Sequence, residues 1–168
     1  DIVREVVPLF PGKYFHIGGD ECPKTSWKNC PTCQKRIETE GLQADGKHSA
    51  EERLQSYVIK RMEKMLAKYD RKIIGWDEIL EGGLSPDATV MSWRGTSGGI
   101  SAALQKHDVI MTPGSGGLYL DHYQGDYKIE PVTIPSAPAY LSRTYNYEPV
   151  PDTIKSLGLE KHILGVQC

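Results

Sequence analysis

Two acidic side chains stand next to each other after a glycine pair, in the stretch FHIGGDEC at residues 15–22. Like charges in contact repel, and a solvated acidic turn needs no apolar lead-in. Neighbouring side chains of a regular strand point to opposite faces, so Asp20 and Glu21 can converge only in an irregular turn. Gly18 and Gly19 permit such a turn. The stretch therefore predicts two carboxylates aimed at one target.

Paired carboxyl groups of this kind are the equipment of glycoside hydrolysis. When two carboxyls lie close together, one tends to keep its proton while the other ionises, which gives an acid beside an anion. Such a pair protonates the leaving sugar oxygen and stabilises the positive charge that develops on the ring. Trp76 and Trp93 follow two later apolar runs and would supply apolar walls against which a sugar packs.

The elements that must hold these residues alternate between short apolar runs and helical patterns. The apolar runs predict strands at 14–18, 72–76, 88–92, 108–112 and 163–167. Helical spacing predicts an opening helix that stops at the Pro-Gly of 11–12, a helix from about 51 to 69, and one around 99–107. This alternation is typical of a parallel sheet covered by helices.

The long helix of about 51–69 is amphipathic, and its apolar stripe predicts the buried face. The residues expected on that face are Leu54, Tyr57, Val58, Met62, Met65, Leu66 and Tyr69.

The predicted strands end in polar and aromatic motifs: GGDE, GWDE, SWRG and YLDHY. Such residues at the carboxyl ends of successive strands are typical of the active face of a (β/α)₈ barrel. Five strands cannot close that barrel, which needs about 250 residues. The sequence therefore predicts an α/β fold, the C-terminal portion of a (β/α)₈ TIM barrel. Both chain ends read as interior segments, so we expect residues 1–168 to be a partial catalytic domain, truncated at both ends.

Composition excludes several classes of function. The 168 residues are 39% hydrophobic and 25% charged, as in soluble globular proteins. A net charge of −2 leaves no basic footprint for nucleic acid. No apolar run approaches the roughly 20 residues needed to span a bilayer. No phosphate-binding G-x-G-x-x-G or P-loop motif is present, and we expect no cofactor.

Three of the four cysteines gather at Cys22, Cys30 and Cys33. The CPTC spacing is half of a zinc site, but no second C-x-x-C or H-x₃₋₅-H follows, and adding His48 fits no standard module. We therefore expect no metal, and a loop of free or disulfide-paired cysteines whose role stays open.

Taken together, the motifs resemble glycoside hydrolase family 20, the β-N-acetylhexosaminidases. HIGGDE is similar to the family signature H-x-G-G-D-E. GWDEI, MSWRG and YLDHY fall in the order and spacing that the family shows after its fourth to seventh barrel strands. The resemblance covers essentially the whole chain, which would span the fourth to eighth strands.

The resemblance implies a role for each residue. Glu21 would be the general acid/base, and Asp20 would orient and charge-stabilise the N–H of the substrate's 2-acetamido group. The acetamido oxygen would be the nucleophile and would form an oxazolinium intermediate, an exception to the two-carboxylate scheme. Tyr119 would hydrogen-bond that oxygen. Asp121, expected on the same strand face as Tyr119, would hold sugar hydroxyls.

The remaining site residues would shape the pocket. Trp76 and Trp93 would line the subsite of the reacting sugar. His16 would face inward, buried and hydrogen-bonded beside the bound substrate, as a supporting residue. Asp77 and Glu78 repeat the acidic pair, but we interpret them as a helix N-terminus, where acids complement the dipole.

Two other functions fit the same residues. An ordinary retaining glycosidase would use Glu21 as acid/base and Asp121 as nucleophile, with carboxyls about 5–5.5 Å apart. A non-catalytic carbohydrate- or protein-binding remnant needs neither role. We expect a glycan with N-acetylhexosamine residues and the remainder of the barrel as partners, and little activity of the isolated chain. The resemblance suggests a periplasmic, secreted or lysosomal location, and leaves N-acetylglucosamine or N-acetylgalactosamine preference open.

Overall fold

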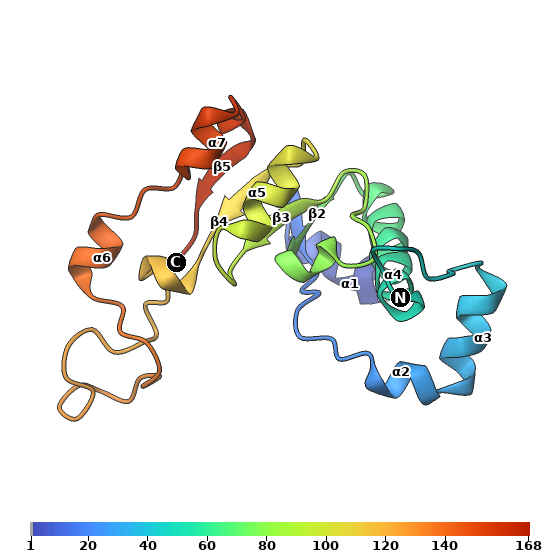
Figure 1. Ribbon diagram of the computed structural model, residues 1–168, viewed down its shortest axis with the longest axis horizontal. Coiled ribbons are helices and arrows are strands. Elements are labelled where there is room, and N and C mark those ends of the chain that lie inside the picture. The colour runs from blue at the N-terminus through green and yellow to red at the C-terminus, as the bar shows by residue number, and fades with distance from the viewer. Residues whose placement is uncertain (1) are drawn as a thin grey trace. The chain divides into compact units, whose positions relative to one another are not determined.

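The computed structural model describes residues 2–168, which divide into two compact units. The first unit ends at Thr89 and the second begins at Val90. Each unit carries parallel strands that alternate with helices (Figure 1), so the predicted α/β class is confirmed. Among the described residues, no helix is long and apolar enough to cross a membrane.

The first unit is built around two parallel strands. Its elements are α1 (Ile2–Val6), η1 (Val7–Leu9), β1 (Tyr14–His16), α2 (Thr25–Asn29), α3 (Pro31–Thr39), α4 (Ala50–Ala67), β2 (Lys72–Trp76) and η2 (Asp77–Leu80). β1 pairs with β2, and the ladder continues past β1, where the Ile17 N–H donates to the Ile74 carbonyl at 2.9 Å. The predicted strands at 14–18 and 72–76 are therefore confirmed, the first of them two residues shorter.

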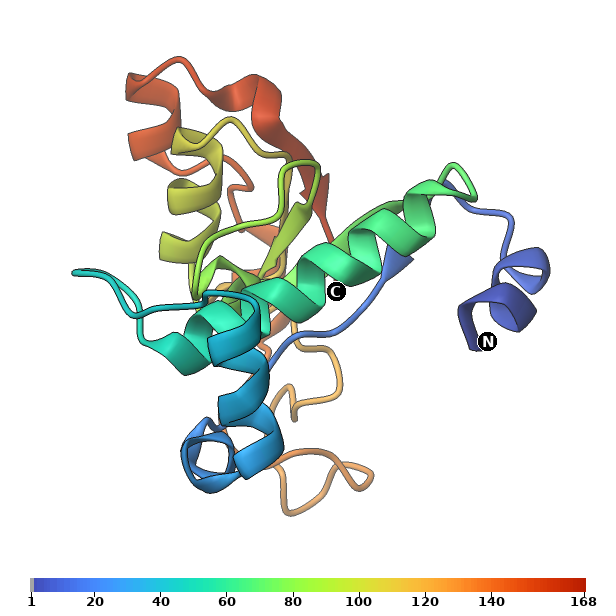
Figure 2. The same ribbon diagram turned by 90° about the vertical axis from the view of Figure 1, so that its right-hand side faces the viewer.

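Helix α4 is the longest of the first unit and lies along β2, with α3 packed against it (Figure 2). It begins with a capping box. The Ser49 hydroxyl accepts the Glu52 N–H at 3.2 Å, and the Glu52 carboxylate accepts the Ser49 N–H at 2.6 Å. Both groups satisfy backbone donors that the first turn leaves free.

The buried face of α4 differs from the predicted one. Val58 and Met65 are 46% and 37% exposed, whereas Gln55 and Ser56 are buried. Both side chains donate hydrogen bonds to neighbouring segments: the Ser56 hydroxyl, for example, donates to the Gly83 carbonyl. The helix therefore turns a partly polar face toward those loops, and the apolar stripe alone misplaces it.

The second unit holds three parallel strands. Its elements are β3 (Thr89–Ser92), which begins at the unit boundary, α5 (Ser97–Leu104), β4 (Val109–Met111), η3 (Gly114–Gly116), α6 (Leu141–Tyr145), α7 (Asp152–Ser156), η4 (Glu160–His162) and β5 (Ile163–Val166). β4 pairs with β3 and with β5. α5 packs against β4 and α7 (Figure 1). α5 can pack this close to β4 because Gly99 has no side chain. A β-carbon there would lie only 2.8 Å from the Met111 sulfur.

The segment 117–123 is not the strand that we expected. Gly117 ends η3 in the left-handed conformation, with φ 74°. A turn follows, in which the His122 N–H donates to the Tyr119 carbonyl at 3.1 Å. Tyr119 and Asp121 consequently lie on a loop, and the argument that they share a strand face is wrong.

Candidate active site

The turn after β1 carries the two adjacent acids on an irregular backbone. Gly18, Gly19 and Glu21 all have positive φ, at 71°, 96° and 44°. A positive φ is uncommon for a residue with a side chain, and such conformations cluster at functional sites. Asp20 and Glu21 are both exposed. The predicted irregular turn is therefore present, and both carboxylates remain accessible to a ligand.

Two hydrogen bonds from neighbouring elements tie this turn to the body of the first unit, and a third joins the same Gln55 side chain to η2. The Trp76 N–H donates to the Gly18 carbonyl at 2.9 Å. The Gln55 side-chain amide donates to the carbonyls of Gly19 and Glu78, both at 3.2 Å. Gln55 is 4% exposed, so these bonds form away from solvent, where an unpaired carbonyl is costly. One α4 residue thus holds the acidic turn against the loop after β2.

The sequence contained a signal for Gln55 that the hydrophobic pattern obscured. It lies four residues before Ile59 and eleven before Leu66, a spacing that places all three on one helix face. Both of those apolar residues are buried. A polar residue in register with a buried stripe indicates a hydrogen-bonded structural position.

Close packing also fixes the turn, because two glycines leave room for Ile79. A β-carbon on Gly19 would lie 2.5 Å from the Ile79 Cγ2 atom, and one on Gly75 would lie 2.6 Å from it. Ile79 is fully buried. The ends of β1 and β2 therefore approach η2 only because both positions lack side chains.

His16 supports the turn from the end of β1. Its Nδ1 accepts the Gly18 N–H at 3.0 Å, and its ring meets the Trp76 ring edge-on at 4.8 Å between centroids. The expectation of a buried histidine is wrong: His16 is exposed at the end of β1, although its ring packs partly against Trp76. Partial burial lowers the pKa of His16, and the negative charge of Asp20 acts in the opposite direction.

The second acidic pair begins a helical segment, as predicted. Asp77 and Glu78 form the first turn of η2, and both are buried. In the loop that follows η2, Glu81 pairs with Lys24 at 2.7 Å. That ion pair joins the segment after the acidic turn to the segment after η2.

The other predicted site residues lie in the second unit. The Tyr119 hydroxyl donates to the Trp93 carbonyl at 3.3 Å, and the Gly114 N–H donates to the same carbonyl at 3.3 Å. A β-carbon on Gly114 would meet the Tyr119 ring at 2.9 Å, so glycine lets the ring lie on the backbone. Asp121 is exposed, 4.0 Å from the His122 Nε2 atom. Tyr119 is thus fixed beside the end of β3.

No metal site accompanies these groups. Across residues 2–168, no three His, Cys, Asp or Glu side chains gather in a way that could hold a metal ion. Cys22, Cys30 and Cys33 are free thiols, and the last two lie at the start of α3.

Substituting Gly19 tests the packing of the turn. We expect Gly19→Ala to lower the free energy of unfolding by about 2–4 kcal/mol, through collision with Ile79 and backbone strain. Gly41→Ala is the matched control, since Gly41 has φ 63° but open space around its β-carbon. It should lose only about 1–2 kcal/mol. Urea unfolding measures both, and equal losses would contradict the packing contact with Ile79.

Proton NMR titration of His16 tests its coupling to Asp20. The midpoint should lie below the ordinary value of about 6.5, and Asp20→Asn should lower it further by removing a favourable charge. Because the folded state binds this proton less tightly, its contribution to stability is complete above the unfolded pKa and is lost as pH falls through the folded pKa. Unchanged His16 titration in the variant would show that Asp20 does not act on it; the other histidines serve as controls.

Comparison with known proteins identifies the family. The profile of the glycosyl hydrolase family 20 catalytic domain matches residues 1–168. A beta-hexosaminidase of Porphyromonas gingivalis is 60% identical over 170 residues, which is 100% of this chain and 21% of that protein. A beta-hexosaminidase of Vibrio furnissii is 35% identical over 168 residues, 99% of this chain and 26% of the other. The chain thus spans about a fifth to a quarter of these relatives.

Solved structures agree. A Vibrio harveyi GH20 exo beta-N-acetylglucosaminidase in complex with N-acetylglucosamine aligns with a TM-score of 0.82 at 32% identity, over 99% of this chain and 25% of that one. The Flavobacterium johnsoniae chitobiase aligns at 0.73 and 28% identity, over 98% and 23%. These likenesses confirm the α/β fold with the parallel strands of an incomplete (β/α)₈ barrel. Since the family profile matches from end to end, the chain belongs to glycosyl hydrolase family 20.

Proposed function

We propose that residues 1–168 are part of a catalytic domain that removes terminal non-reducing N-acetyl-β-D-hexosamine residues from glycans. Membership of the family and the beta-hexosaminidase relatives support the reaction class. The observation that carries the proposal is the turn after β1, which exposes Asp20 and Glu21 on a strained, tightly anchored backbone. A strained backbone that is held by hydrogen bonds and carries two exposed acids is expected where the orientation of those acids matters for function.

We assign the proton transfers to Glu21. It protonates the glycosidic oxygen as the bond breaks and later removes a proton from the attacking water, as retaining mechanisms require. The substrate's acetamido oxygen is the nucleophile, and attack at the anomeric carbon closes an oxazolinium ring. Asp20 accepts a hydrogen bond from the acetamido N–H and stabilises the positive charge that develops there.

Roles are also proposed for Tyr119, Asp121 and Trp93. Tyr119 donates its hydroxyl to the acetamido oxygen, exchanging its present bond to the Trp93 carbonyl for one to the substrate. Asp121 accepts from sugar hydroxyls, and Trp93 offers an apolar face. Held at both its nitrogen and its oxygen, the acetamido group reacts intramolecularly, where effective concentration lowers the barrier.

Trp76 and His16 are proposed to bind the sugar beside the acidic turn. The edge-on contact between their rings fixes the indole beside the acidic turn. A sugar ring stacks on such a face through its C–H groups. The Vibrio harveyi relative, crystallised with N-acetylglucosamine, supports N-acetylhexosamine as the substrate class.

Conservative substitutions of the acids test these roles. In the complete protein, Glu21→Gln should lower kcat on a nitrophenyl N-acetyl-β-glucosaminide by about 10²–10⁴-fold, through loss of the proton donor. Asp20→Asn should also lower kcat, and fluorination of the acetamido methyl should slow the wild-type enzyme because it weakens the nucleophile. Glu38→Gln on the exposed surface of α3 is the control and should retain activity.

Substrate choice separates this mechanism from a two-carboxylate glycosidase. Steady-state kinetics on the plain β-glucoside should show little turnover, since it lacks the internal nucleophile. Comparable rates on both sugars, with Asp121→Asn more damaging than Asp20→Asn, would instead favour a covalent aspartyl intermediate.

We further propose that residues 1–168 alone turn over little substrate, with the remainder of the barrel as their required partner. Five strands of an eight-stranded barrel leave parallel strand edges without neighbours, and a site at the barrel mouth needs several strands. Expressed alone, the chain should show less than about 1% of the complete protein's kcat/KM, a loss of more than roughly 2.7 kcal/mol in transition-state stabilisation. Equal activity of the two would overturn this expectation.

A further inference from the structure

The CPTC segment places two thiols on the first turn of α3. Cys30 is the N-cap residue, Pro31 occupies the first helical position and Cys33 lies in the first turn. The Cys30 carbonyl accepts the Gln34 N–H at 3.0 Å, so the helix begins there. Residues three apart at a helix start are neighbours, and a disulfide joins Cα atoms about 4.4–6.8 Å apart. The two sulfurs can therefore be joined with little movement.

The two thiols are not equivalent. The adjacent Cys33, first through its backbone and then through its thiol, lowers the pKa of Cys30. The same thiol–thiol contact raises the pKa of Cys33. Cys30, at the helix N-terminus, is therefore the thiol that ionises more readily, as in reactive C-x-x-C pairs.

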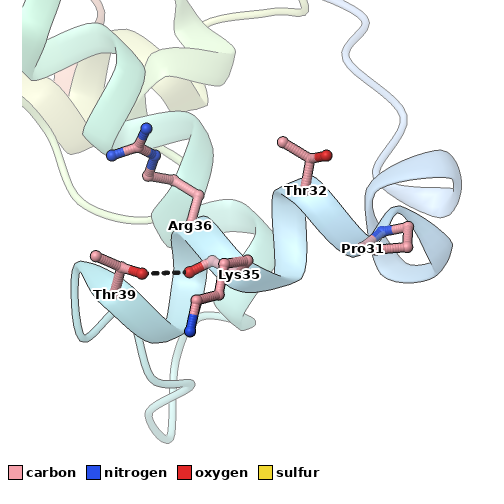
Figure 3. A pocket seen from close by; sticks show the side chains of 5 residues that line it. All are labelled: Pro31, Thr32, Lys35, Arg36 and Thr39. Carbon is pink, nitrogen blue, oxygen red and sulfur yellow. Dashed lines mark hydrogen bonds between the residues drawn. The ribbon is translucent and has the colours of Figure 1, made fainter.

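Solvent and small molecules can reach this turn. Both cysteines are partly exposed, and Pro31 and Thr32 between them border an open hollow of about 450 Å³, also lined by Lys35, Arg36 and Thr39 (Figure 3). Lys35 already pairs with Glu38, and Arg36 pairs with Glu40 at the end of the helix. The hollow thus admits a small reagent without selecting it by charge.

Helix α3 keeps its place independently of the two sulfurs. The Gln34 side-chain amide donates to the Trp27 carbonyl at 2.9 Å and to the Glu51 carboxylate at 3.1 Å. Ile37 is buried on the inner face. A bond between the thiols therefore need not unravel the helix or detach it from α4.

We propose that Cys30 and Cys33 form a redox-active dithiol, which small disulfides of the glutathione class oxidise reversibly to an intramolecular disulfide. The Cys30 thiolate attacks one sulfur of the oxidant, whose S–S bond breaks and releases one glutathione thiolate. Cys33 then loses its proton to solvent, and its thiolate attacks the Cys30 sulfur and displaces the second glutathione. Two protein thiols are oxidised, and one glutathione disulfide becomes two glutathiones.

Mass spectrometry tests the proposal without reference to catalysis. The folded protein is equilibrated with graded glutathione and glutathione disulfide, alkylated and digested with trypsin. The tryptic peptide Asn29–Lys35 contains both cysteines and neither of the other two. It should shift from doubly alkylated to unalkylated and lighter by two hydrogens as the buffer becomes oxidising, and revert with dithiothreitol. A peptide that stays doubly alkylated throughout would overturn the proposal.

Single variants assign the order of attack. Cys33→Ser should trap a glutathione adduct on Cys30, while Cys30→Ser should form its adduct on Cys33 about tenfold more slowly. Cys22→Ser and Cys168→Ser are controls that should leave the peptide's behaviour unchanged. Equal adduct rates in the first two variants, or loss of the disulfide in the Cys22 variant, would contradict the assigned pair.

Discussion

The contact between Ile79 and the bare backbones of Gly19 and Gly75 sets the geometry of the first unit's strand ends. Any β-carbon at either glycine would enter the space of the buried isoleucine. The chain can therefore bend into the left-handed conformation directly after β1 while η2 packs beneath it. In a regular strand, by contrast, neighbouring side chains would point to opposite faces.

The polar face of α4 complements this packing. Gln55 satisfies the carbonyls of Gly19 and Glu78 at once, so the acidic turn and the loop after β2 form one hydrogen-bonded unit. Buried polar groups are tolerated when they are paired, and such pairs specify one arrangement of the elements around them. These hydrogen bonds hold the backbone of the turn in place, while the side chains of Asp20 and Glu21 stay exposed to solvent.

Short sequence patterns correctly predicted the features of the fold that depend on neighbouring residues in the chain. The strands, the long helix expected at about 51–69 and the helical role of Asp77 and Glu78 follow from apolar runs and terminus signals, and the structure confirms them. The buried side of α4 and the loop at Tyr119 were not predicted, because they depend on hydrogen bonds and left-handed glycines set by distant residues. The catalytic roles rest on motif order rather than on geometry, and stay proposals.

We propose that Asp20 binds the acetamido group of an N-acetyl sugar, while Glu21 transfers the proton to the leaving oxygen. The most direct measurement is a crystal structure of the complete protein with a thiazoline analogue of the cyclised intermediate. We predict the Asp20 carboxylate within hydrogen-bonding distance, about 2.6–3.2 Å, of the analogue's ring nitrogen. The Glu21 carboxylate should lie beside the anomeric carbon, on the face from which the leaving group departs. An analogue bound with Asp20 turned away from that nitrogen would contradict the account.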